Sequence, residues 1–441
     1  MTEAPLLEVE GLEVHFPLRG SFGARLLGRS SGAVQAVDGV SFSVGAGEVL
    51  GVVGESGSGK TTLGRALLRL VDPTAGVVRL DGRDVASMSE RDVRAMRREM
   101  QIVFQDPHAS LNPAMTLETA VGHPLKIHGI TRDRAEIRRR VSEVLERVGL
   151  TPAEQYLGKF PSDLSGGQKQ RAVLARAVIL GPRLLVADEP VSMLDMSVRA
   201  KILELMLGLK RDFDLTYLYI THDLATAKFF CDRVAIMYLG RIVEIGSTDE
   251  IFANPRHPYT ESLLRAIPDP DPSAGIPRDL PRGEVPDAAQ PPLGCRFHPR
   301  CPRAFEVCGW ESRDLHDLLE ARWAVGGPER FEAERAVLGD VDALDRPVQR
   351  IRIAAGSGRS GEQVAALLAD IRQEQSDERL WSGVRSINAD AGSAEVVFHP
   401  GSDPALLPEG GVEVACHLYD PEAMEEAARA RGGEDTSPAV T

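Results

Sequence analysis

The sequence predicts an α/β fold in which an open sheet with buried parallel strands carries the functional residues. Apolar runs at residues 49–53, 184–187 and 215–220 are nearly continuous, as buried parallel strands require. Helical segments lie between these runs, and polar residues stand where each run ends. Since such a sheet binds its ligand in the crevice at the carboxyl ends of its strands, we expect the active residues there.

The length and charge of the chain limit its organisation and its partners. A chain of 441 residues is long enough for two or three domains, and 43% hydrophobic residues supply a sizeable core. The net charge of −14 argues against a nucleic-acid partner, whose phosphates demand a basic surface. No signal peptide is recognised and no apolar stretch reaches about 20 residues, so we expect a soluble, cytoplasmic protein.

The first part of the chain is expected to contain mainly short strands. Alternating apolar and polar residues over 6–53 predict a half-exposed antiparallel sheet, interrupted by a loop rich in Gly, Ser and Arg at 19–34. Residues 77–82 predict a strand that ends in a turn, and residues 102–104 predict a short strand leading to Gln105.

Residues 116–180 are expected to be helical, and a further helix is predicted at 197–211. Gly149 fits a helix stop. The apolar residues that recur at helical spacing before it are Ile137, Val141, Val144, Leu145 and Val148.

The segment from Gly54 to Thr61 carries the most specific signal. It reads G-x-x-x-x-G-K-T between an apolar strand and a helix, which is the P-loop pattern. Glycines let backbone N–H groups approach a polyphosphate, and the helix points the positive end of its dipole at it. Lys60 would bind the β- and γ-phosphates, and Thr61 would offer its hydroxyl to Mg²⁺. The predicted nucleotide-binding residues here are Gly54, Ser56, Gly57, Gly59, Lys60, Thr61 and Thr62.

Two carboxylates follow the buried run at 184–187. Asp188 can hold Mg²⁺ through water, and Glu189 can act as general base on the attacking water. An Asp-Glu pair alone is more often a solvated turn, but its position downstream of a P-loop favours the catalytic interpretation.

A second glycine-bearing helix N-terminus begins at residues 164–168, with the sequence Leu-Ser-Gly-Gly-Gln. Such a helix start can bind phosphate, and an ordinary Ser N-cap is the alternative. One chain with two phosphate-binding devices could use them on two different nucleotides.

Together these residues resemble the ATP-binding cassette of ABC transporters over about residues 6–265. The P-loop, Gln105, the 164–168 motif, Asp188-Glu189, the 192–195 segment and His222 occur in the order of that family. The resemblance implies a RecA-like α/β core, an antiparallel β subdomain and a helical subdomain at about 107–180. It also implies a head-to-tail ATPase dimer with ATP sandwiched between the subunits.

The resemblance gives each motif residue a role. Glu189, His222 and Gln105 would be catalytic, and Mg²⁺ would be held by Thr61, Gln105 and Asp188. Phe16 is a candidate to stack on adenine, and a plain strand residue is an equal alternative. The residues that would act on the partner's nucleotide or cross the dimer interface are Ser165, Gly166, Gly167, Gln168 and Asp195.

Two further segments, residues 104–113 and 254–264, are similar to the ATP-binding subunits of oligopeptide/dipeptide and related nickel importers. A linker rich in Pro and Asp follows at 268–293. The resemblance implies an energy-coupling ATPase bound peripherally to the cytoplasmic face of the membrane. Its partners would be two permease subunits, a second ATP-binding subunit (itself or a sister) and, indirectly, an extracytoplasmic solute-binding protein.

Four of the five cysteines, Cys295, Cys301, Cys308 and Cys416, lie in the C-terminal part, whereas Cys231 is expected in the core. Four thiolates suit a [4Fe–4S] cluster or zinc, and His298 or His417 could replace one thiol around zinc. Buried inert cysteines are the third alternative. Spacing leaves iron–sulfur and zinc open, and the resemblance favours the cluster, because that subfamily often carries a cysteine group here.

The long gap between Cys308 and Cys416 departs from the family and puts Cys416 in doubt as the fourth ligand. The sequence predicts an inserted α+β module at 309–412, with strands at 347–355 and 394–398 and a helix at 362–371. The other predicted units are an ATP-binding domain at 1–255 and an importer-type extension at 256–308 plus 413–420. A disordered tail is predicted at 421–441.

Two other functions fit parts of the sequence. A soluble ABC ATPase of translation or repair commonly has a second cassette or a long coiled coil, and neither is recognised here. A metal-cluster redox sensor would use the cassette as its actuator.

Overall fold

The chain, in this computed structural model, forms two compact units, Met1–Asn254 and Pro255–Thr441. The structure describes residues 4–18, 32–267 and 283–432. Most of the predicted 19–34 loop and of the 268–293 linker therefore lies outside the described residues. Residues 33 and 34, which the sequence placed in that loop, begin strand β2.

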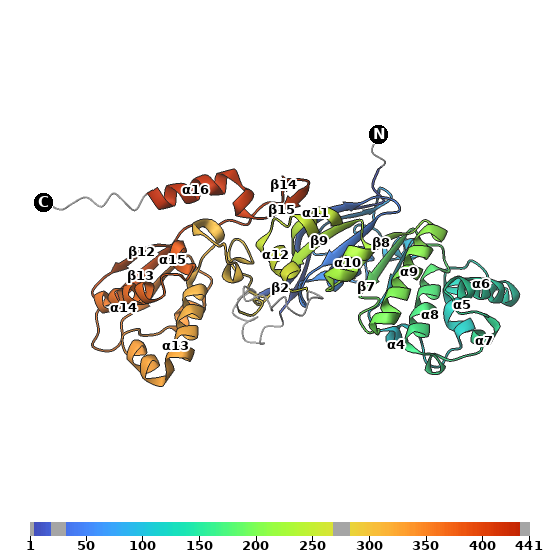
Figure 1. The fold of residues 1–441 in the computed structure, drawn as a ribbon, viewed down its shortest axis with the longest axis horizontal. Helices are drawn as coiled ribbons and strands as arrows, with labels where there is room; N and C mark the ends of the chain where they lie inside the picture. The colour runs from blue at the N-terminus through green and yellow to red at the C-terminus, as the bar shows by residue number, and fades with distance from the viewer. Residues whose placement is uncertain (1–3, 19–31, 268–282, 433–441) are drawn as a thin grey trace, which may run out of the picture. The chain divides into compact units, whose positions relative to one another are not determined.

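The first unit is built on a sheet that positions the sequence motifs (Figure 1). Strands β9, β3, β8, β7 and β6 run parallel in that order, and β10 is antiparallel to β9. All residues of β3, β7 and β8 are buried, which explains their apolar sequences. The strand bounds are β10 (Arg241–Ser247), β9 (Arg233–Tyr238), β3 (Val49–Val53), β8 (Thr216–Thr221), β7 (Leu184–Asp188) and β6 (Met100–Val103).

Helix α2 (Lys60–Leu67) follows β3 and packs close to the sheet at Gly64. A Cβ atom at Gly64 would lie 2.7 Å from Ile220 Cδ1 and 3.1 Å from Val186 Cγ1. The other helices that alternate with the strands are α9 (Met196–Phe213), α10 (Leu224–Phe230) and α11 (Thr248–Ala253).

A separate antiparallel sheet has the strand order β2-β1-β4-β5. Buried and exposed residues alternate along much of β1, as expected for a sheet with one solvated face. The bounds are β2 (Ala33–Val44), β1 (Leu7–Pro17), β4 (Ala75–Leu80) and β5 (Arg83–Asp84).

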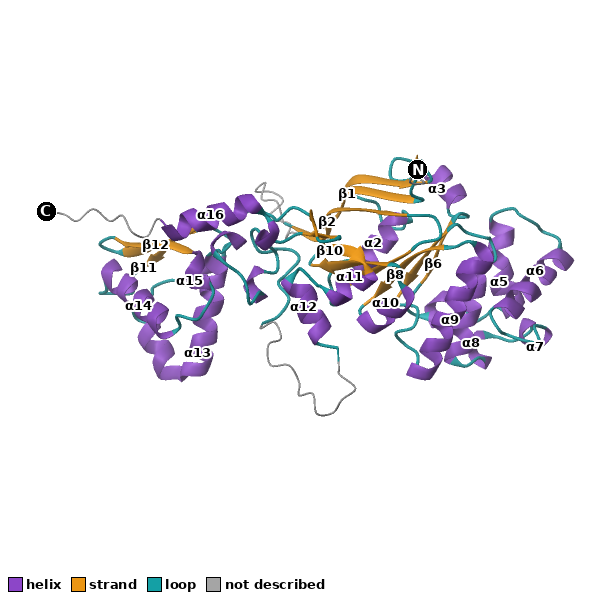
Figure 2. Cartoon of the chain, turned by 45° about the horizontal axis from the view of Figure 1, so that its top comes forward, coloured by secondary structure: helices purple, strands orange, loops and turns teal. Residues whose placement is uncertain are grey.

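Helices fill the segment between β6 and β7, and Figure 2 shows α5 to α8 grouped together with α9. Helix α6 buries Ile137, Val141, Val144 and Leu145, the apolar residues at helical spacing. Gly149 follows this helix with a φ of 74°, which suits a helix stop. The bounds are α4 (Pro107–Ser110), α5 (Leu117–Ile127), α6 (Arg134–Arg147), α7 (Glu154–Leu157) and α8 (Gly166–Val178), and α3 (Glu90–Met96) precedes β6.

The second unit contains the antiparallel sheet β11-β13-β12, covered by α14. Strands β11 and β13 and helix α14 match the predicted strands and helix. Helix α13, which is kinked at Gly327, was not predicted. The bounds are α12 (Pro258–Arg265), α13 (Ser312–Arg335), β11 (Arg350–Ala354), α14 (Gly361–Glu374), α15 (Leu380–Gly383), β12 (Val384–Ala389), β13 (Ser393–Phe398), β14 (Leu407–Glu409), β15 (Val412–Val414) and α16 (Pro421–Gly432).

One hydrophobic core joins segments that the sequence analysis assigned to different units. Ala304 and Cys308, from the predicted extension, pack in the same buried cluster as Leu368 and Trp381 from residues 309–412. The 309–412 segment therefore shares its hydrophobic interior with the cysteine loops.

The disorder predicted from residue 421 is wrong for residues 421–432, which form helix α16. Ala423 and Ala427 lie one turn apart and pack on Val307 and Phe305. Arg431 Nε also donates to Glu306 Oε1 at 3.0 Å. Composition alone does not reveal these contacts, because both partners lie more than 100 residues away. Residues 433–441 lie outside the described residues.

Candidate active site

The P-loop connects β3 to α2, and its backbone fits tightly against neighbouring strands. Gly57 and Gly59 have φ values of 81° and 100°, which favour glycine. A Cβ atom at Gly59 would lie 1.9 Å from Ala36 O, and one at Gly54 would lie 2.1 Å from Met237 O. Since both obstacles are backbone atoms, no larger residue fits at either position without moving the loop.

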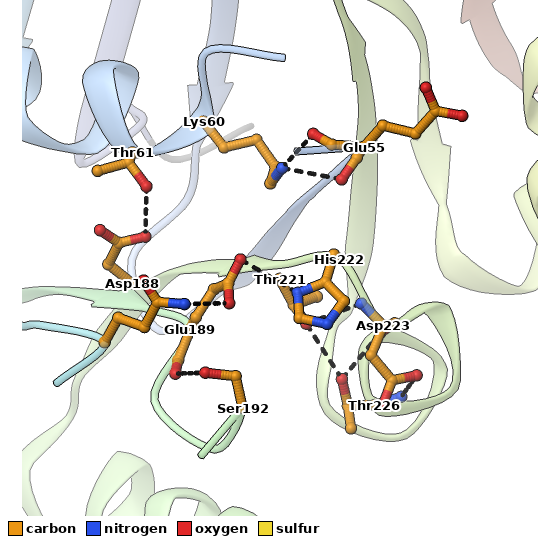
Figure 3. Close-up of polar contacts among 12 residues, drawn as sticks. Glu55, Lys60, Thr61, Asp188, Glu189, Ser192, Thr221, His222, Asp223 and Thr226 are labelled. Carbon is orange, nitrogen blue, oxygen red and sulfur yellow. Dashed lines mark hydrogen bonds and ion pairs between the residues drawn. The ribbon is translucent and has the colours of Figure 1, made fainter. Parts of the chain in front are cut away.

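Lys60 lies inside this loop and close to two carboxylates. Its Nζ donates to Gly54 O and Glu55 O, both at 2.8 Å (Figure 3). It also donates to Ser58 Oγ at 3.3 Å. Burial lowers the pKa of the ammonium below its usual value, and the charges of Glu189, Asp188 and Glu55 oppose that shift. The loop thus holds a cation where a polyphosphate would be bound.

Thr61 and Asp188 are direct neighbours at the end of β7. Thr61 Oγ1 donates to Asp188 Oδ1 at 3.0 Å (Figure 3). Asp188 is only 3% exposed, and this burial raises the pKa of its carboxyl, while the hydrogen bond from Thr61 acts in the opposite direction. The structure therefore brings together two of the three residues predicted to hold Mg²⁺.

Glu189, which follows β7, contacts residues that follow the neighbouring strands β6 and β8. Gln105 Nε2, just after β6, donates to Glu189 Oε2 at 2.8 Å, and His222 Nδ1, just after β8, lies 3.1 Å from Glu189 Oε1. Ser192 Oγ donates to the carbonyl of Glu189 at 3.1 Å. The three residues predicted to be catalytic are thus in contact through one carboxylate, which itself is mostly buried.

Two residues whose roles the sequence did not reveal, Asp223 and Arg199, fix the chain directly after His222. Asp223 caps α10 by accepting from Ala225 N at 2.9 Å, and its own N–H donates to Thr221 Oγ1 at 3.0 Å. Arg199 Nη1 donates to the second oxygen of Asp223 at 3.1 Å. The Asp-before-helix pattern is an N-cap signal that could have identified Asp223, but the pairing with Arg199 depends on the fold.

The other predicted nucleotide-site residues lie on exposed helix starts or strand ends. Ser165 caps α8: its Oγ accepts from Gln168 N at 3.4 Å, and its N–H donates to Gln168 Oε1 at 3.0 Å. Ser165, Gly166 and Asp195 are exposed, so a second molecule could contact them. Phe16 lies near the end of β1 with 41% of its surface exposed.

The four cysteines of the second unit lie near one another in a buried site. Burial raises the pKa of Cys295 well above its usual value, and the other three thiols, Cys308, Cys416 and Cys301, raise it further. Burial likewise raises the pKa of Cys301 and of Cys308 to about 12. Among the described residues, no three of these thiol sulfurs lie within 4.8 Å of one another.

The two histidines considered as zinc ligands differ in their hydrogen bonds. His298 uses both ring nitrogens: Nδ1 lies 2.8 Å from Cys295 O, and Nε2 lies 3.1 Å from Asp314 Oδ2. This arrangement leaves His298 no nitrogen for a metal. His417 places Nε2 at 2.9 Å from Ser402 O, and within the described part of the chain its Nδ1 has no hydrogen-bond partner.

Two segments of the chain match models of known protein families. The family model described as ABC transporter matches residues 37–192, and the model described as oligopeptide/dipeptide transporter, C-terminal region, matches residues 243–308. The second match includes three of the four clustered cysteines.

Curated relatives are similar over most of their own length. A putative peptide import ATP-binding protein of Brucella ovis is 48% identical over 318 residues, which are 72% of this chain and 96% of that protein. The oligopeptide transport ATP-binding protein AppF of Bacillus subtilis is 45% identical over 69% of this chain and 91% of its own length. In the described ranges, none of the helices combines the length and apolar character that crossing a bilayer requires. The chain belongs to the ATP-binding proteins of the ABC transporter family that carry the oligopeptide/dipeptide transporter C-terminal region.

Proposed function

We propose that this chain is the ATP-hydrolysing, energy-coupling subunit of an importer for oligopeptides, dipeptides or related solutes. The observation that carries the proposal is the convergence of Gln105, Glu189 and His222 beside a P-loop whose Thr61 contacts Asp188. The names of the relatives, which describe peptide import, support the choice of solute class.

The residues around Glu189 suit hydrolysis of a nucleoside triphosphate. Lys60 would neutralise the β- and γ-phosphates, and Thr61, Asp188 and Gln105 would hold Mg²⁺, which when bound would offset phosphate charge in the transition state. Glu189 takes a proton from the attacking water, and its contacts with Gln105 and His222 keep the carboxylate directed at that water. The remaining nucleotide contacts come from the P-loop backbone, with Phe16 against the base.

The exposed residues at the starts of α8 and α9 act on a second cassette. Ser165, Gly166, Gly167 and Gln168 close over the nucleotide of the partner, and Asp195 crosses the interface. Closure of two cassettes around ATP drives two permease subunits, and hydrolysis resets them. The protein therefore acts at the cytoplasmic face of the membrane, and an extracytoplasmic solute-binding protein delivers the solute.

We further propose that Cys295, Cys301, Cys308 and Cys416 hold a [4Fe–4S] cluster. A single zinc ion with tetrahedral Zn–S bonds of about 2.3 Å brings its sulfurs to about 3.8 Å from one another. In the described part of the chain no three of these sulfurs lie within 4.8 Å of one another, which suits a cluster, in which each thiolate binds a different iron, better than a single zinc ion. Zinc, with His417 in place of one thiol, is the alternative.

Metal analysis separates the two. Protein purified without oxygen should be brown, absorb near ~400 nm and contain about four irons per chain. Stoichiometric zinc without colour would exclude the cluster.

The transport function is tested by isolating the tagged full chain from its own cells in mild detergent. We expect two membrane-spanning permease chains and a second ATP-binding chain in the complex, with ATP hydrolysis that increases when solute-loaded binding protein is added. A complex with ribosomes or DNA and no membrane-spanning chain would contradict the proposal.

A further inference from the structure

We infer that residues 309–412 form the frame of the cysteine site, so that the fold of this segment and metal binding at the four thiols stabilise each other. The metal part of this inference rests on the proposed cluster or zinc site. The frame itself rests on three contacts, one for each stretch of chain that carries a cysteine.

The first contact joins the Cys295–Cys301 loop to helix α13. His298 lies between these two cysteines and is 1% exposed. Its Nδ1 lies 2.8 Å from Cys295 O, and its Nε2 lies 3.1 Å from Asp314 Oδ2, which also accepts from Glu311 N at 2.8 Å. A buried carboxylate of α13 thereby fixes the ring that supports the Cys295 backbone.

The second contact places α15 against the turn that carries Cys308. Trp310, two residues after this cysteine, donates from Nε1 to Phe305 O at 2.8 Å. Its ring lies so close to α15 that a Cβ atom at Gly383 would be 2.0 Å from Trp310 Cδ1. Cys308 itself belongs to the buried cluster that includes Leu368 of α14.

The third contact ties Cys416 to the end of the same segment. Ser402 O lies 2.9 Å from Nε2 of His417, the residue after Cys416. A Cβ atom at Gly294, beside Cys295, would be 3.1 Å from that same Ser402 oxygen. Cys295 N also donates to Cys308 O at 2.9 Å, so the stretches of Cys295 and Cys308 are joined directly to each other as well as to the frame.

Because the cysteine loops and the 309–412 core are packed together, a change in one must alter the other. A metal bound to all four thiols would hold these loops in place and stabilise the core that they cover. Conversely, loosening the core at a position away from the thiols would weaken metal retention.

The full-length chain tests this with two equally buried leucines. Leu368→Ala opens the frame, and Leu145→Ala in α6 is the matched control in the other unit; both leucines are 0% exposed. After anaerobic purification, transfer of the bound metal to a chelator is followed by absorbance. We expect release from Leu368→Ala to be at least about tenfold faster, equivalent to about 1.4 kcal/mol in the barrier to release, and release from Leu145→Ala to stay within about twofold of the unmodified chain.

Hydrogen exchange measures the same coupling from the other side. Removing the metal should speed amide exchange in α13, α14 and β13 but not in α6. If Leu368→Ala fails to fold, Asp314→Asn removes only the charge facing His298 and should also release metal faster, with a changed spectrum of the bound metal. Unaltered release in these variants, together with unaltered exchange on metal removal, would overturn the inference.

Thiol labelling distinguishes two ways in which the inference could be wrong: residues 309–412 do not support the cysteine loops, or the four thiols bind no metal. If the unmodified chain carries no metal, the proposed metal site fails, and the frame is then judged by the rate at which a thiol reagent labels the four cysteines. Faster labelling in Leu368→Ala supports the frame, with Cys231 of the first unit as the internal control. Equal labelling refutes it.

Discussion

At Glu189 the backbone adopts a conformation that residues with a side chain rarely use. Its φ of 47° lies in the left-handed region, and its N–H donates to Ile220 O at 2.9 Å. Such a residue costs on the order of 1 kcal/mol and persists where the surroundings hold it. In this conformation the Glu189 carboxylate contacts Gln105 and His222, whereas that of Asp188 contacts Thr61, which fits the different roles proposed for the two adjacent acids.

Replacing this carboxylate should separate binding from hydrolysis. We expect Glu189→Gln to bind ATP normally and to lose about 10²–10⁴-fold in kcat, because the amide cannot accept the proton of water. Nucleotide binding is measured by calorimetry and turnover by phosphate release. Glu143→Gln, at a side chain that is 57% exposed, is the control. Normal turnover in Glu189→Gln would remove Glu189 as the base.

Two P-loop glycines should respond differently to the same substitution. Both Gly57 and Gly59 have positive φ, but a Cβ atom at Gly57 meets no atom within 4 Å, whereas one at Gly59 meets Ala36 O. Gly57→Ala should therefore cost only the strain of about 1 kcal/mol, and Gly59→Ala should also displace the loop and abolish ATP binding. Thermal unfolding and ATP titration measure the two effects. Equal losses of stability and ATP binding in the two variants would show that backbone strain, and not the contact of Gly59 with β2, causes the effect.

Among the helices and strands, the strands that are buried on both faces were the easiest to predict from the sequence. Strands β3, β7 and β8 were predictable because a strand covered on both sides must be apolar throughout. Helix α13 was not, since Gly326, Gly327 and Pro328 interrupt its pattern. Helix α16 was missed because its apolar contact consists of two alanines whose partners are distant in sequence.

Helix α12 begins at a buried histidine that should make the second unit sensitive to acid. His257 Nδ1 accepts from Tyr259 N at 3.0 Å, and burial above all lowers the pKa of His257 to about 3. An unfolded chain binds a proton at this residue below about pH 6.5, whereas the folded chain does not until about pH 3. The contribution of His257 to stability is therefore complete above pH 6.5 and is lost as the pH falls toward 3, by about 1.4 kcal/mol per pH unit.

Tryptophan fluorescence can follow this loss, because all three tryptophans (Trp310, Trp323 and Trp381) belong to the second unit. We expect the urea midpoint of the fluorescence change to fall between pH 6.5 and pH 5. In His257→Asn, which keeps a capping side chain, the midpoint should fall less steeply. The same slope in both proteins would show that other groups govern the acid response.

For the whole molecule, the parts of the site that the sequence predicted are those within short motifs. Lys60, Thr61, Asp188 and Glu189 could be identified because strand, loop and helix follow one another in the chain. The contact of Gly59 with Ala36 and the pairing of Arg199 with Asp223 could not, since they depend on how separate elements pack. The sequence therefore predicted the candidate reacting residues but not the tertiary contacts that position them.

Pairing of two molecules is the whole-molecule property on which transport depends. We expect Glu189→Gln protein with ATP to associate, either with itself or with a sister ATP-binding chain, as measured by sedimentation. Adding Ser165→Arg should weaken this association at least about tenfold, because a large cation would have to be buried against the second molecule. Ser162→Arg, three residues earlier and also exposed, should have little effect. Unchanged association in the Ser165 variant would exclude this helix start from the contact.

The missing side chain at Gly64 has a consequence for evolution and engineering. It lets α2 pack closely on the sheet, and we expect the distance between this helix and the sheet to determine whether Thr61 contacts Asp188. The affinity for nucleotide could then be changed through the packing between α2 and the sheet, at residues outside the predicted nucleotide site. Gly64→Ala should weaken ATP binding. A second change, Ile220→Val, removes the methyl group that the new Cβ atom would meet and should restore binding. If the double variant binds ATP no better than Gly64→Ala alone, the packing between α2 and the sheet does not control the affinity for ATP.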